Sequence, residues 1–402
     1  MEKKSDMKKV LIIGAGFLQS FVIRKAKEMG YHTLAVDADP NAVGFRYADE
    51  YGVVNIVDRD ACLAFAKEHR IDGVLTAATD YGVLTASFVA REMGLPGLDY
   101  AAAERIKNKY LVRKCLYEHH VDDTEQAYEV HTDTDLADLA GKLRYPVMVK
   151  PCDGSGSRGA SRVDGREGLE NACKAAMDSS ITHRAEIETF ITGREYGAES
   201  LVVNGEVHVL AIMKKWMTEP PYYAELGHAL PSGLPEETEK KVIGCVKNAI
   251  EALGVNFGSV NMDMLITEDG KVYIVDIGAR MGGNMIGPCI VPYGKGIDYM
   301  AAMLANAVGD RVDLTPRPHG AVATKLLAFG REGKILRLPD FEKLEKEYGV
   351  EIYHHMTVGD TVHEYHTNLD GCGYVVAREE SAEAAVEKAA SVRDRIETIC
   401  FH

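Results

Sequence analysis

Two aspartates, Asp263 and Asp276, lie in strand-like runs on either side of the pair Asp269-Gly270. Asp-Gly is favoured in two-residue type I′ hairpin turns. Counting back from such a turn places Asp263 opposite Asp276, with β-carbons about 5 Å apart. Two carboxylates at that distance among apolar neighbours repel unless a divalent cation or a shared proton compensates. All-oxygen ligation suits Mg²⁺, which also accepts phosphate oxygens and water.

The residues beside the two aspartates extend this candidate site. Side chains alternate along a strand, so Asn261 shares the face of Asp263, and Gly278 and Arg280 share the face of Asp276. Gly278 leaves room, and the planar guanidinium of Arg280 suits a phosphate. The alternative is a surface hairpin with solvated acids, for which the flanking Val, Met, Leu and Ile residues are too apolar.

A lysine and a Gly/Ser-rich segment form a second candidate, for phosphate binding. Lys150 ends the strand-like run VMVK on the same face as Met148, and burying its charge is costly unless it meets an anion. Residues 153–159, DGSGSRG, then lead to a second strand, and their backbone N–H groups can bind phosphate oxygens. They are not a Walker A loop, because no Gly-Lys-Ser/Thr follows. A mobile surface hairpin is the alternative.

Charged residues also gather in the helix expected over 101–120 and around a later turn. The helix is the most basic stretch of the chain, and a solvated helix face is the alternative to a functional role. Its basic residues are Lys107, Lys109, Arg113 and Lys114. Downstream, Glu188 and Glu195 flank a turn at Gly193, and 201–213 reads as a hairpin with Asn204-Gly205 as its turn.

The first hundred residues must position part of this chemistry, and they alternate strand and helix signals. Strands are expected at 8–14, 31–37, 52–58 and 71–80, which predicts a parallel sheet with helices on both faces. The run Gly14-Ala15-Gly16 with Asp37 further on is typical of a nicotinamide site, but Gln19 replaces the third glycine. The alternative is a tight turn before a helix N-terminus, which can hold an anionic group. Asp80 ends the fourth strand as a ligand contact or a helix cap.

Length, charge and cysteine usage limit the functional classes. A chain of 402 residues predicts two or three domains, and it has no apolar run of about 18 residues that predicts a membrane span. The net charge of −15 argues against nonspecific nucleic-acid binding and against an anionic membrane surface. Eight scattered cysteines without a C-x-x-C pair indicate reduced thiols rather than zinc or disulfides. We expect a cytoplasmic protein, because no apolar signal segment is seen, and a homodimer by default.

Taken in order, these motifs resemble the ATP-grasp superfamily over nearly the whole chain. GAGFLQ opens the first sheet, and the segments that follow are Asn108-Lys109, VMVKP, DGSGSRG, E-T-F-I-x-G-x-E and the acid-bearing hairpin. The resemblance implies an α/β and α+β protein. A Rossmann-like parallel-sheet domain would precede the ATP-grasp fold, and a small α+β domain would follow it. The implied domains are 1–105, then the small lobe 106–192 and the large lobe 193–315 of the ATP-grasp fold, and 316–402.

The resemblance also implies a nucleotide site. Lys109 and Lys150 would contact the ATP phosphates, and Glu195 would hold the ribose. The adenine hinge would contain Glu188, Phe190 and Ile191. The flap over the phosphates would be formed by the backbone of Ser155, Gly156, Ser157, Arg158 and Gly159.

The implied metal site would hold Mg²⁺, with Mn²⁺ as an alternative, on Asp263 and Asp276. Arg280 would act with Lys150 as a catalytic residue and stabilise an acyl phosphate. One departure concerns the second metal strand, which usually reads acid-x-Asn in the family. This chain has Asp276-Ile277-Gly278, so one protein ligand is missing.

Within the superfamily, the L-amino-acid ligase branch gives the strongest resemblance. It is carried by the aromatic and proline-rich segment 214–235, by the ending 278–284 and by the C-terminal stretch from 320 onward. The candidate substrate residues are His228, Ser232 and Asn284. The expected activity is ATP- and Mg²⁺-dependent phosphorylation of a small carboxylate, an amino acid, to an acyl phosphate that condenses with an amine. ADP and phosphate would be released.

Other members of the superfamily leave alternatives open. Phosphoribosylglycinamide synthetases of nucleotide biosynthesis share the architecture, and carbamoyl-phosphate-synthase-like proteins also resemble this chain. A nucleotide-binding regulator without catalysis is a further alternative, supported only by the departure at Gly278.

Overall fold

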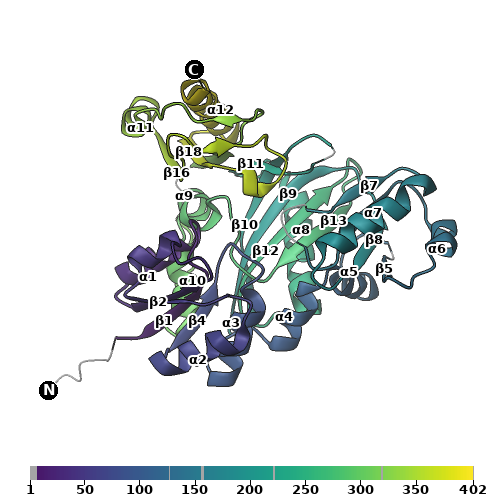
Figure 1. Ribbon diagram of the computed structural model, residues 1–402, viewed down its shortest axis with the longest axis horizontal. Helices are drawn as coiled ribbons and strands as arrows, with labels where there is room; N and C mark the ends of the chain where they lie inside the picture. The colour runs from purple at the N-terminus through teal and green to yellow at the C-terminus, as the bar shows by residue number, and fades with distance from the viewer. Residues whose placement is uncertain (1–6, 126, 155–157, 221, 318–319, 402) are drawn as a thin grey trace.

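The structure is a computed structural model that describes residues 7–125, 127–154, 158–220, 222–317 and 320–401. A parallel sheet lies near the N-terminus and a smaller antiparallel sheet lies on the opposite side of the molecule, with a long antiparallel sheet between them (Figure 1). No helix in the described part of the chain is long and apolar enough to cross a membrane.

The N-terminal sheet is parallel, as the alternating signals predict, and its strand order is β3-β2-β1-β4. The third strand ends earlier than predicted, because Asp58 accepts a hydrogen bond from Ala61 N and starts the next helix. The elements of this region are β1 (Lys9–Ile13), α1 (Gln19–Glu28), β2 (His32–Asp37), β3 (Glu50–Val53), α2 (Arg59–His69), β4 (Gly73–Thr76), α3 (Val83–Met93), α4 (Tyr100–Lys107) and α5 (Lys109–Glu118).

The glycine turn after β1 is held by its own neighbours. Asp37 accepts hydrogen bonds from Ala15 N at 2.8 Å and from Asp39 N at 3.0 Å. Gln19, at the position of a third glycine, donates through Nε2 to Ala77 O at 2.6 Å. The carboxylate that a nicotinamide site would use for a ribose is therefore engaged in a tight turn, which is the alternative that the sequence left open.

The smaller antiparallel sheet has the order β5-β8-β6-β7. Val147, Val149 and Ile187 are buried on one of its faces, against helix α7 and its neighbours, so Met148 and Lys150 face the other way. Its elements are β5 (Tyr128–Val130), α6 (Leu136–Lys142), β6 (Val147–Pro151), β7 (Ser161–Val163), α7 (Arg166–Ser179) and β8 (Ala185–Thr189).

The long sheet has eight antiparallel strands in the order β13-β12-β9-β10-β11-β14-β18-β16. The C-terminal strands thus continue the sheet that carries the acid hairpin. The strands are β9 (Arg194–Val203), β10 (Glu206–Met217), β11 (Glu225–Leu230), β12 (Gly258–Ile266), β13 (Val272–Gly278), β14 (Ala321–Leu326), β16 (Val350–His354) and β18 (Gly373–Glu379). The predicted hairpin between β9 and β10 is confirmed, with Asn204 and Gly205 at φ of 52° and 79°.

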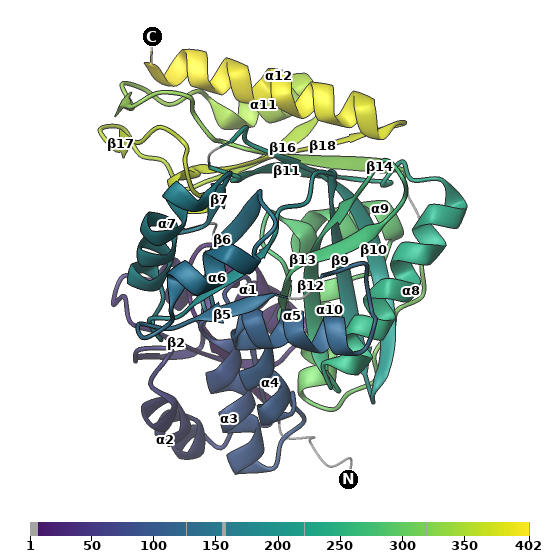
Figure 2. The same cartoon turned by 90° about the vertical axis from the view of Figure 1, so that its right-hand side faces the viewer.

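Helices cover the long sheet at several places. Helix α12 lies over β14 and β18 at one end of the molecule (Figure 2). The remaining helices and strands are α8 (Glu236–Ala252), α9 (Val291–Lys295), α10 (Tyr299–Ala307), β15 (Gly333–Lys334), α11 (Phe341–Tyr348), β17 (Thr361–Val362) and α12 (Ala382–Phe401). The domain boundaries at 105, 192 and 315 stay predictions.

Candidate active site

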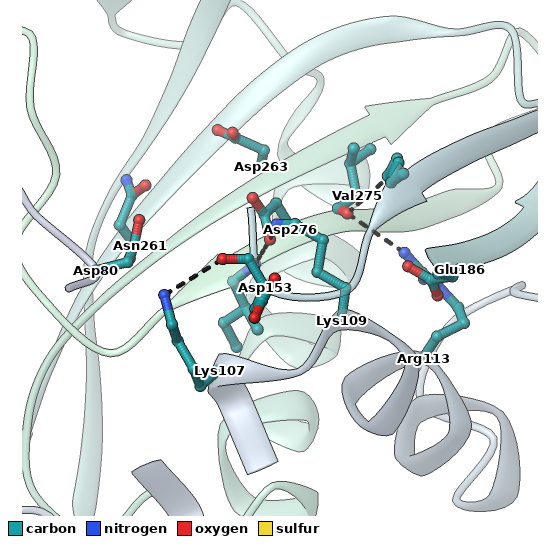
Figure 3. A network of polar contacts seen from close by, with 12 residues as sticks. Asp80, Lys107, Lys109, Arg113, Asp153, Glu186, Asn261, Asp263, Val275 and Asp276 are labelled. Carbon is teal, nitrogen blue, oxygen red and sulfur yellow. Dashed lines mark hydrogen bonds and ion pairs between the residues drawn. The ribbon is translucent and has the colours of Figure 1, made fainter. Parts of the chain in front are cut away.

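The acid hairpin brings the two aspartates face to face, as the sequence predicts. Strands β12 and β13 pair Asp263 with Asp276, and the next pair on the same face is Asn261 with Gly278. Figure 3 shows the two side chains near each other, and both line the same cavity. The predicted juxtaposition is confirmed.

The turn that produces this pairing differs from the prediction. Thr267 N–H donates to the Lys271 carbonyl at 3.0 Å, so the loop has three residues rather than two. It ends on Gly270 at φ 77°, the left-handed residue that such a loop requires. The longer loop shifts the register by one residue, and a bulge at Val275 shifts it back before Asp276. The predicted two-residue turn is wrong, and the predicted pair is correct only because of the bulge.

Each aspartate contacts a lysine from a different element. Lys109, at the start of α5, places Nζ 2.5 Å from Asp276 Oδ1. Lys215, on β10, places Nζ 2.7 Å from Asp263 Oδ1 and 2.5 Å from Glu225 Oε1. The compensation that two opposed carboxylates require is therefore provided by two ammonium groups.

Burial and these lysines move the pKa values of the two aspartates apart. Burial raises the pKa of Asp276, but the charge of Lys109 outweighs this effect and holds the pKa below its usual value. For Asp263, burial prevails over the attraction of Lys215, and the pKa is raised. Asp276 is therefore the more firmly ionised of the two acids.

A cavity of about 480 Å³ opens beside the paired aspartates, a size typical of small-molecule sites. Its apolar wall contains Met148, Phe190, Ile191, Met217, Leu265 and Ile274. Its polar wall contains Lys109, Lys150, Glu188, Glu195 and Arg158. Burial raises the pKa of Glu195 to about 7. The structure thus brings to one cavity seven of the eight described residues that the sequence assigned to a nucleotide, Gly159 being the exception.

Lys150 lies on the cavity wall and meets an anion, as its position in the strand predicts. It forms a close ion pair with Glu188, and its Nζ lies 3.5 Å from Val275 O at the bulge. Glu188 also forms an ion pair with Arg113, whose Nε lies 2.9 Å from Oε2. Burial raises the pKa of Glu188, but Arg113 and Lys150 outweigh it and lower the pKa.

The sequence did not place Arg113 in the site. A solvated helix face was the open alternative for the basic residues of this helix. The Arg113 side chain is buried and touches Glu188, Thr124 and the Val275 carbonyl, at 2.9, 2.8 and 3.4 Å. Arg113 follows Lys109 by four residues, so both project from one side of α5. That spacing was the signal that could have identified it.

The flap is described only at its two ends, because the predicted residues Ser155, Gly156 and Ser157 lie outside the described residues. At the first end, the Asp153 carboxylate accepts hydrogen bonds from Ile181 N and Thr182 N at 3.1 and 3.0 Å, and Lys107 Nζ lies 3.3 Å from the Asp153 carbonyl (Figure 3).

At the second end, Arg158 donates through Nη2 to Tyr81 OH at 2.7 Å. Gly159 has φ 71°, and a β-carbon there would lie 2.6 Å from Ser179 Oγ. This end of the flap therefore reaches the loop between β4 and α3, and a side chain at Gly159 would displace Ser179.

Arg280 lies on the other side of the paired aspartates, between two lobes. Asp80 binds its guanidinium twice, through Nε at 3.0 Å and Nη2 at 3.2 Å. The third contact is from Nη1 to Asn261 Oδ1 at 3.1 Å. Asp80 is therefore the anion that holds Arg280. The N-cap of α3 is Gly82 rather than Asp80, and a ligand contact by Asp80 stays a prediction.

The same packing explains the departure at Gly278. A β-carbon at this position would lie 2.7 Å from Asp80 Oδ1 and 3.1 Å from Arg280 Cζ. The first distance is shorter than β-carbon contacts in proteins and the second is tight, so the side chains of Asp80 and Arg280 would have to shift. An asparagine in the family position would therefore displace the pair formed by Asp80 and Arg280.

The three candidate substrate residues have different surroundings in the structure. Asn284 donates a short hydrogen bond to Glu225, and buried His228 is the strand partner of Lys215 and interacts with the charge of Glu225. Burial lowers the pKa of His228 to about 4, so the imidazole is neutral at pH 7. Ser232 donates to Glu239 Oε2 at 2.7 Å at the start of α8 and lies outside the described cavity lining. None of the three residues is part of the described lining of the 480 Å³ cavity, and their roles as substrate residues stay predictions.

Sequence reasoning also missed Lys215, although strand alternation places only one of Lys214 and Lys215 on the buried face. Replacing Lys215 with methionine is expected to lower the free energy of unfolding by about 2–4 kcal/mol, because Asp263 and Glu225 lose their buried counter-ion. Urea unfolding followed by circular dichroism measures the change.

The matched control is Lys240→Met, which removes an ion pair with Glu236 on the exposed face of α8. This change is expected to cost at most about 0.5 kcal/mol. Equal effects of the two substitutions would show that Lys215 does not hold the two carboxylates.

Two family models match the chain. One, described as ATP-grasp domain, matches residues 143–288, which contain the flap, the cavity and the acid hairpin. The other, described as L-amino acid ligase C-terminal domain 2, matches residues 325–399.

Solved structures and sequence relatives agree with these matches. The L-amino acid ligase from Bacillus licheniformis has a TM-score of 0.83 at 25% identity, covering 96% of this chain and 97% of that chain. Phosphoribosylglycinamide synthetase from Anaerococcus prevotii has a TM-score of 0.78 at 23% identity, covering 97% and 98%. Formate-dependent phosphoribosylglycinamide formyltransferase from Ignicoccus hospitalis is 22% identical, over 69% of this chain and 70% of its own length. The chain therefore contains an ATP-grasp domain followed by a C-terminal domain of the L-amino acid ligase type, a pair of domains that marks it as an ATP-grasp ligase.

Proposed function

We propose that the protein uses ATP and Mg²⁺ to phosphorylate the carboxylate of an amino acid and joins the resulting acyl phosphate to an amine, releasing ADP and phosphate. One observation carries this proposal. The opposed Asp263 and Asp276 separate a nucleotide-sized cavity lined by Lys109 and Lys150 from a fixed arginine, Arg280. A phosphoryl group moving across this boundary would meet positive charge on both sides.

The nucleotide side is suited to ATP. Phe190 and Ile191 offer an apolar wall for a purine, and Glu195 is a carboxylate at the rim that can accept ribose hydroxyls. Lys109 and Lys150 are paired with carboxylates in the absence of ligand, so phosphate oxygens can replace Asp276 and Glu188 as their partners. Phosphoryl transfer depends mainly on such positioning and charge neutralisation.

The residues present fit Mg²⁺. The donors are hard oxygens, the carboxylates of Asp263 and Asp276 with the Asn261 amide nearby, and the described residues hold no cluster of three or more acidic, His or Cys ligands. Mg²⁺ commonly uses one or two carboxylates and completes its shell with phosphate oxygens and water. Bound there, it would neutralise charge on the transferring phosphoryl group.

Two observations support an amino acid as the carboxylate substrate. The C-terminal match is to a domain of L-amino acid ligases. Beyond Asp263, half-buried Glu225 shares the Lys215 ammonium with that aspartate, so the three groups keep one net negative charge, which suits an ammonium group. Glycine at position 278 leaves room for the side chains of Asp80 and Arg280, which gives its departure from the family pattern an explanation other than loss of catalysis.

The test is release of ADP and phosphate with ATP, Mg²⁺ and pools of amino acids and small carboxylates, with mass spectrometry of the products. ADP together with a condensed product supports the proposal and identifies the substrates. ATP binding without turnover in every pool would favour the regulator. Turnover only with a phosphoribosylamine would favour the synthetase alternative.

Replacing Lys150 with alanine is expected to weaken ATP binding at least about tenfold, because one charge-assisted phosphate contact is lost. Isothermal titration with a non-hydrolysable ATP analogue measures the dissociation constant. Lys142→Ala, which removes a surface lysine paired with Asp138 in the same lobe, is the control and should leave it unchanged. Equal affinity of the Lys150 variant and the parent would remove Lys150 from the phosphate site.

A further inference from the structure

Glu199, on β9, is a buried carboxylate to which the proposed chemistry gives no role. Its side chain is inaccessible to solvent, and three hydrogen-bond donors surround it. Tyr299 OH lies 2.6 Å from Oε1, Gly282 N lies 3.1 Å from Oε1, and Asn261 Nδ2 lies 2.9 Å from Oε2. Burial raises the pKa of Glu199 to about 7, and the donated hydrogen bonds oppose that rise. With these partners in place, Glu199 acts on its neighbours rather than on a ligand.

The most important of these neighbours is Asn261, which links Glu199 to Arg280. The carboxylate of Glu199 can only accept, so the NH₂ group of Asn261 must face it. The guanidinium of Arg280 can only donate, so the amide oxygen of Asn261 must face Arg280 Nη1, at 3.1 Å. The amide therefore has one orientation that satisfies both sides, and Glu199 sets it.

Glu199 also holds the loop that carries Arg280. Gly282 N donates to both carboxylate oxygens, at 3.1 and 3.3 Å. A β-carbon at Gly282 would lie 2.8 Å from Asn261 Nδ2 and 2.9 Å from Glu199 Oε2, so the loop backbone rests directly on this pair. Figure 3 shows Asn261 beside Asp80, the second residue that binds Arg280.

We propose that Glu199 is a positioning residue of the ligase. It fixes the amide of Asn261 and the backbone at Gly282, and through them it aims the guanidinium of Arg280 at the acyl phosphate. The inference rests on the proposed function, which gives Arg280 its role. Asp80 orients the guanidinium through Nε and Nη2. Glu199, on β9, adds a second constraint through Asn261, which contacts the third nitrogen, Nη1.

The substitution Glu199→Gln tests this relay with little change in shape. Gly282 N–H lies nearer Oε1, so the new oxygen takes that position and the new NH₂ group faces Asn261. The Asn261 amide must then turn over and present its own NH₂ group to Arg280. We expect kcat to fall about 10- to 100-fold, while the KM for ATP stays within about twofold. A crystal structure should show that Arg280 has left Asn261.

The double variant Glu199→Gln with Asn261→Asp should restore the relay. The introduced glutamine then accepts from Tyr299 and Gly282 through its oxygen and donates to the introduced carboxylate, which accepts from Arg280. The formal charge equals that of the parent. Asn261→Asp alone places two carboxylates together and should be impaired, whereas the double variant should recover to within about fivefold of the parent kcat.

Tyr299→Phe separates positioning from simple packing. It removes a donor to Glu199 without touching Asn261 or Arg280, so it should lower the melting temperature and leave kcat within about threefold. A loss in Tyr299→Phe equal to that in Glu199→Gln would assign Glu199 a structural role only.

Three further results would overturn the inference. They are an unchanged kcat in Glu199→Gln, a double variant as inactive as the single variants although folded, and failure of both variants to fold. Each comparison uses the parent protein under the conditions where it makes ADP. A parent that makes no ADP with any substrate would instead reject the proposed function.

Discussion

Replacing Asp276 with asparagine is expected to reduce kcat/KM for the ATP-dependent condensation about 100-fold or more. The amide keeps the shape of the side chain but removes the more firmly ionised of the two opposed acids. It also leaves Lys109 without the carboxylate that it contacts at 2.5 Å. Groups that stabilise charge in a transition state commonly contribute effects of this size. Steady-state ADP release with the identified substrates measures the loss.

A second readout concerns the metal itself. Mn²⁺ titration of the protein with a non-hydrolysable ATP analogue, followed by electron paramagnetic resonance, should show weaker metal binding in Asp276→Asn. The control is Asp269→Asn, at the exposed turn of the same hairpin, where the acid interacts with Thr267 and Lys271 rather than with the site. If Asp276→Asn keeps activity and Mn²⁺ affinity within a few-fold of the parent, Asp276 is not a metal ligand.

Replacing Arg280 with alanine is expected to lower kcat about 100-fold or more while ATP affinity stays close to that of the parent. The reason is its location. The guanidinium lies across the paired aspartates from the nucleotide cavity, so it can meet the acyl phosphate without holding ATP. Single-turnover ADP formation and nucleotide titration measure the two quantities separately.

The substitution Arg280→Lys tests whether a positive charge alone is sufficient at this position. Lysine keeps the charge but cannot form the planar contacts that Asp80 and Asn261 make with the guanidinium. We expect most of the loss seen with alanine. Arg395→Ala, on the exposed side of α12, is the control and should leave kcat unchanged. Weaker ATP binding with an unaltered chemical step would move Arg280 to the nucleotide side of the site.

Local patterns were sufficient to predict much of the fold. The alternation of strand and helix signals predicted the parallel sheet, because each βαβ unit is short and continuous in the chain. The Asn204-Gly205 turn predicted its hairpin for the same reason. The acid hairpin shows where such reasoning reaches its limit. A turn one residue longer and a bulge at Val275 cancel each other, and neither is encoded in a simple two-residue period.

The partners of the site residues could not be predicted, because they come from distant segments. Asp80 and Arg280 are separated by 200 residues, and they meet because the loop after β4 packs against the segment that follows β13. Lys215 lies next to Lys214 in the sequence, and the chain alone does not show which of the two is buried beside Asp263. Gly278 could be identified as a departure, but its cause became visible only with Asp80 and Arg280 packed against it.

The central claim is that the carboxylate substrate becomes an acyl phosphate, and transfer of an oxygen isotope tests it most directly. The protein is incubated with ATP, Mg²⁺, an amine and amino acids labelled with ¹⁸O in their carboxylates. Phosphate released during turnover is then analysed by mass spectrometry. We expect one ¹⁸O atom in each phosphate, carried over from the activated carboxylate. Turnover that releases unlabelled phosphate would contradict it, because ATP would then be hydrolysed without activation of the carboxylate.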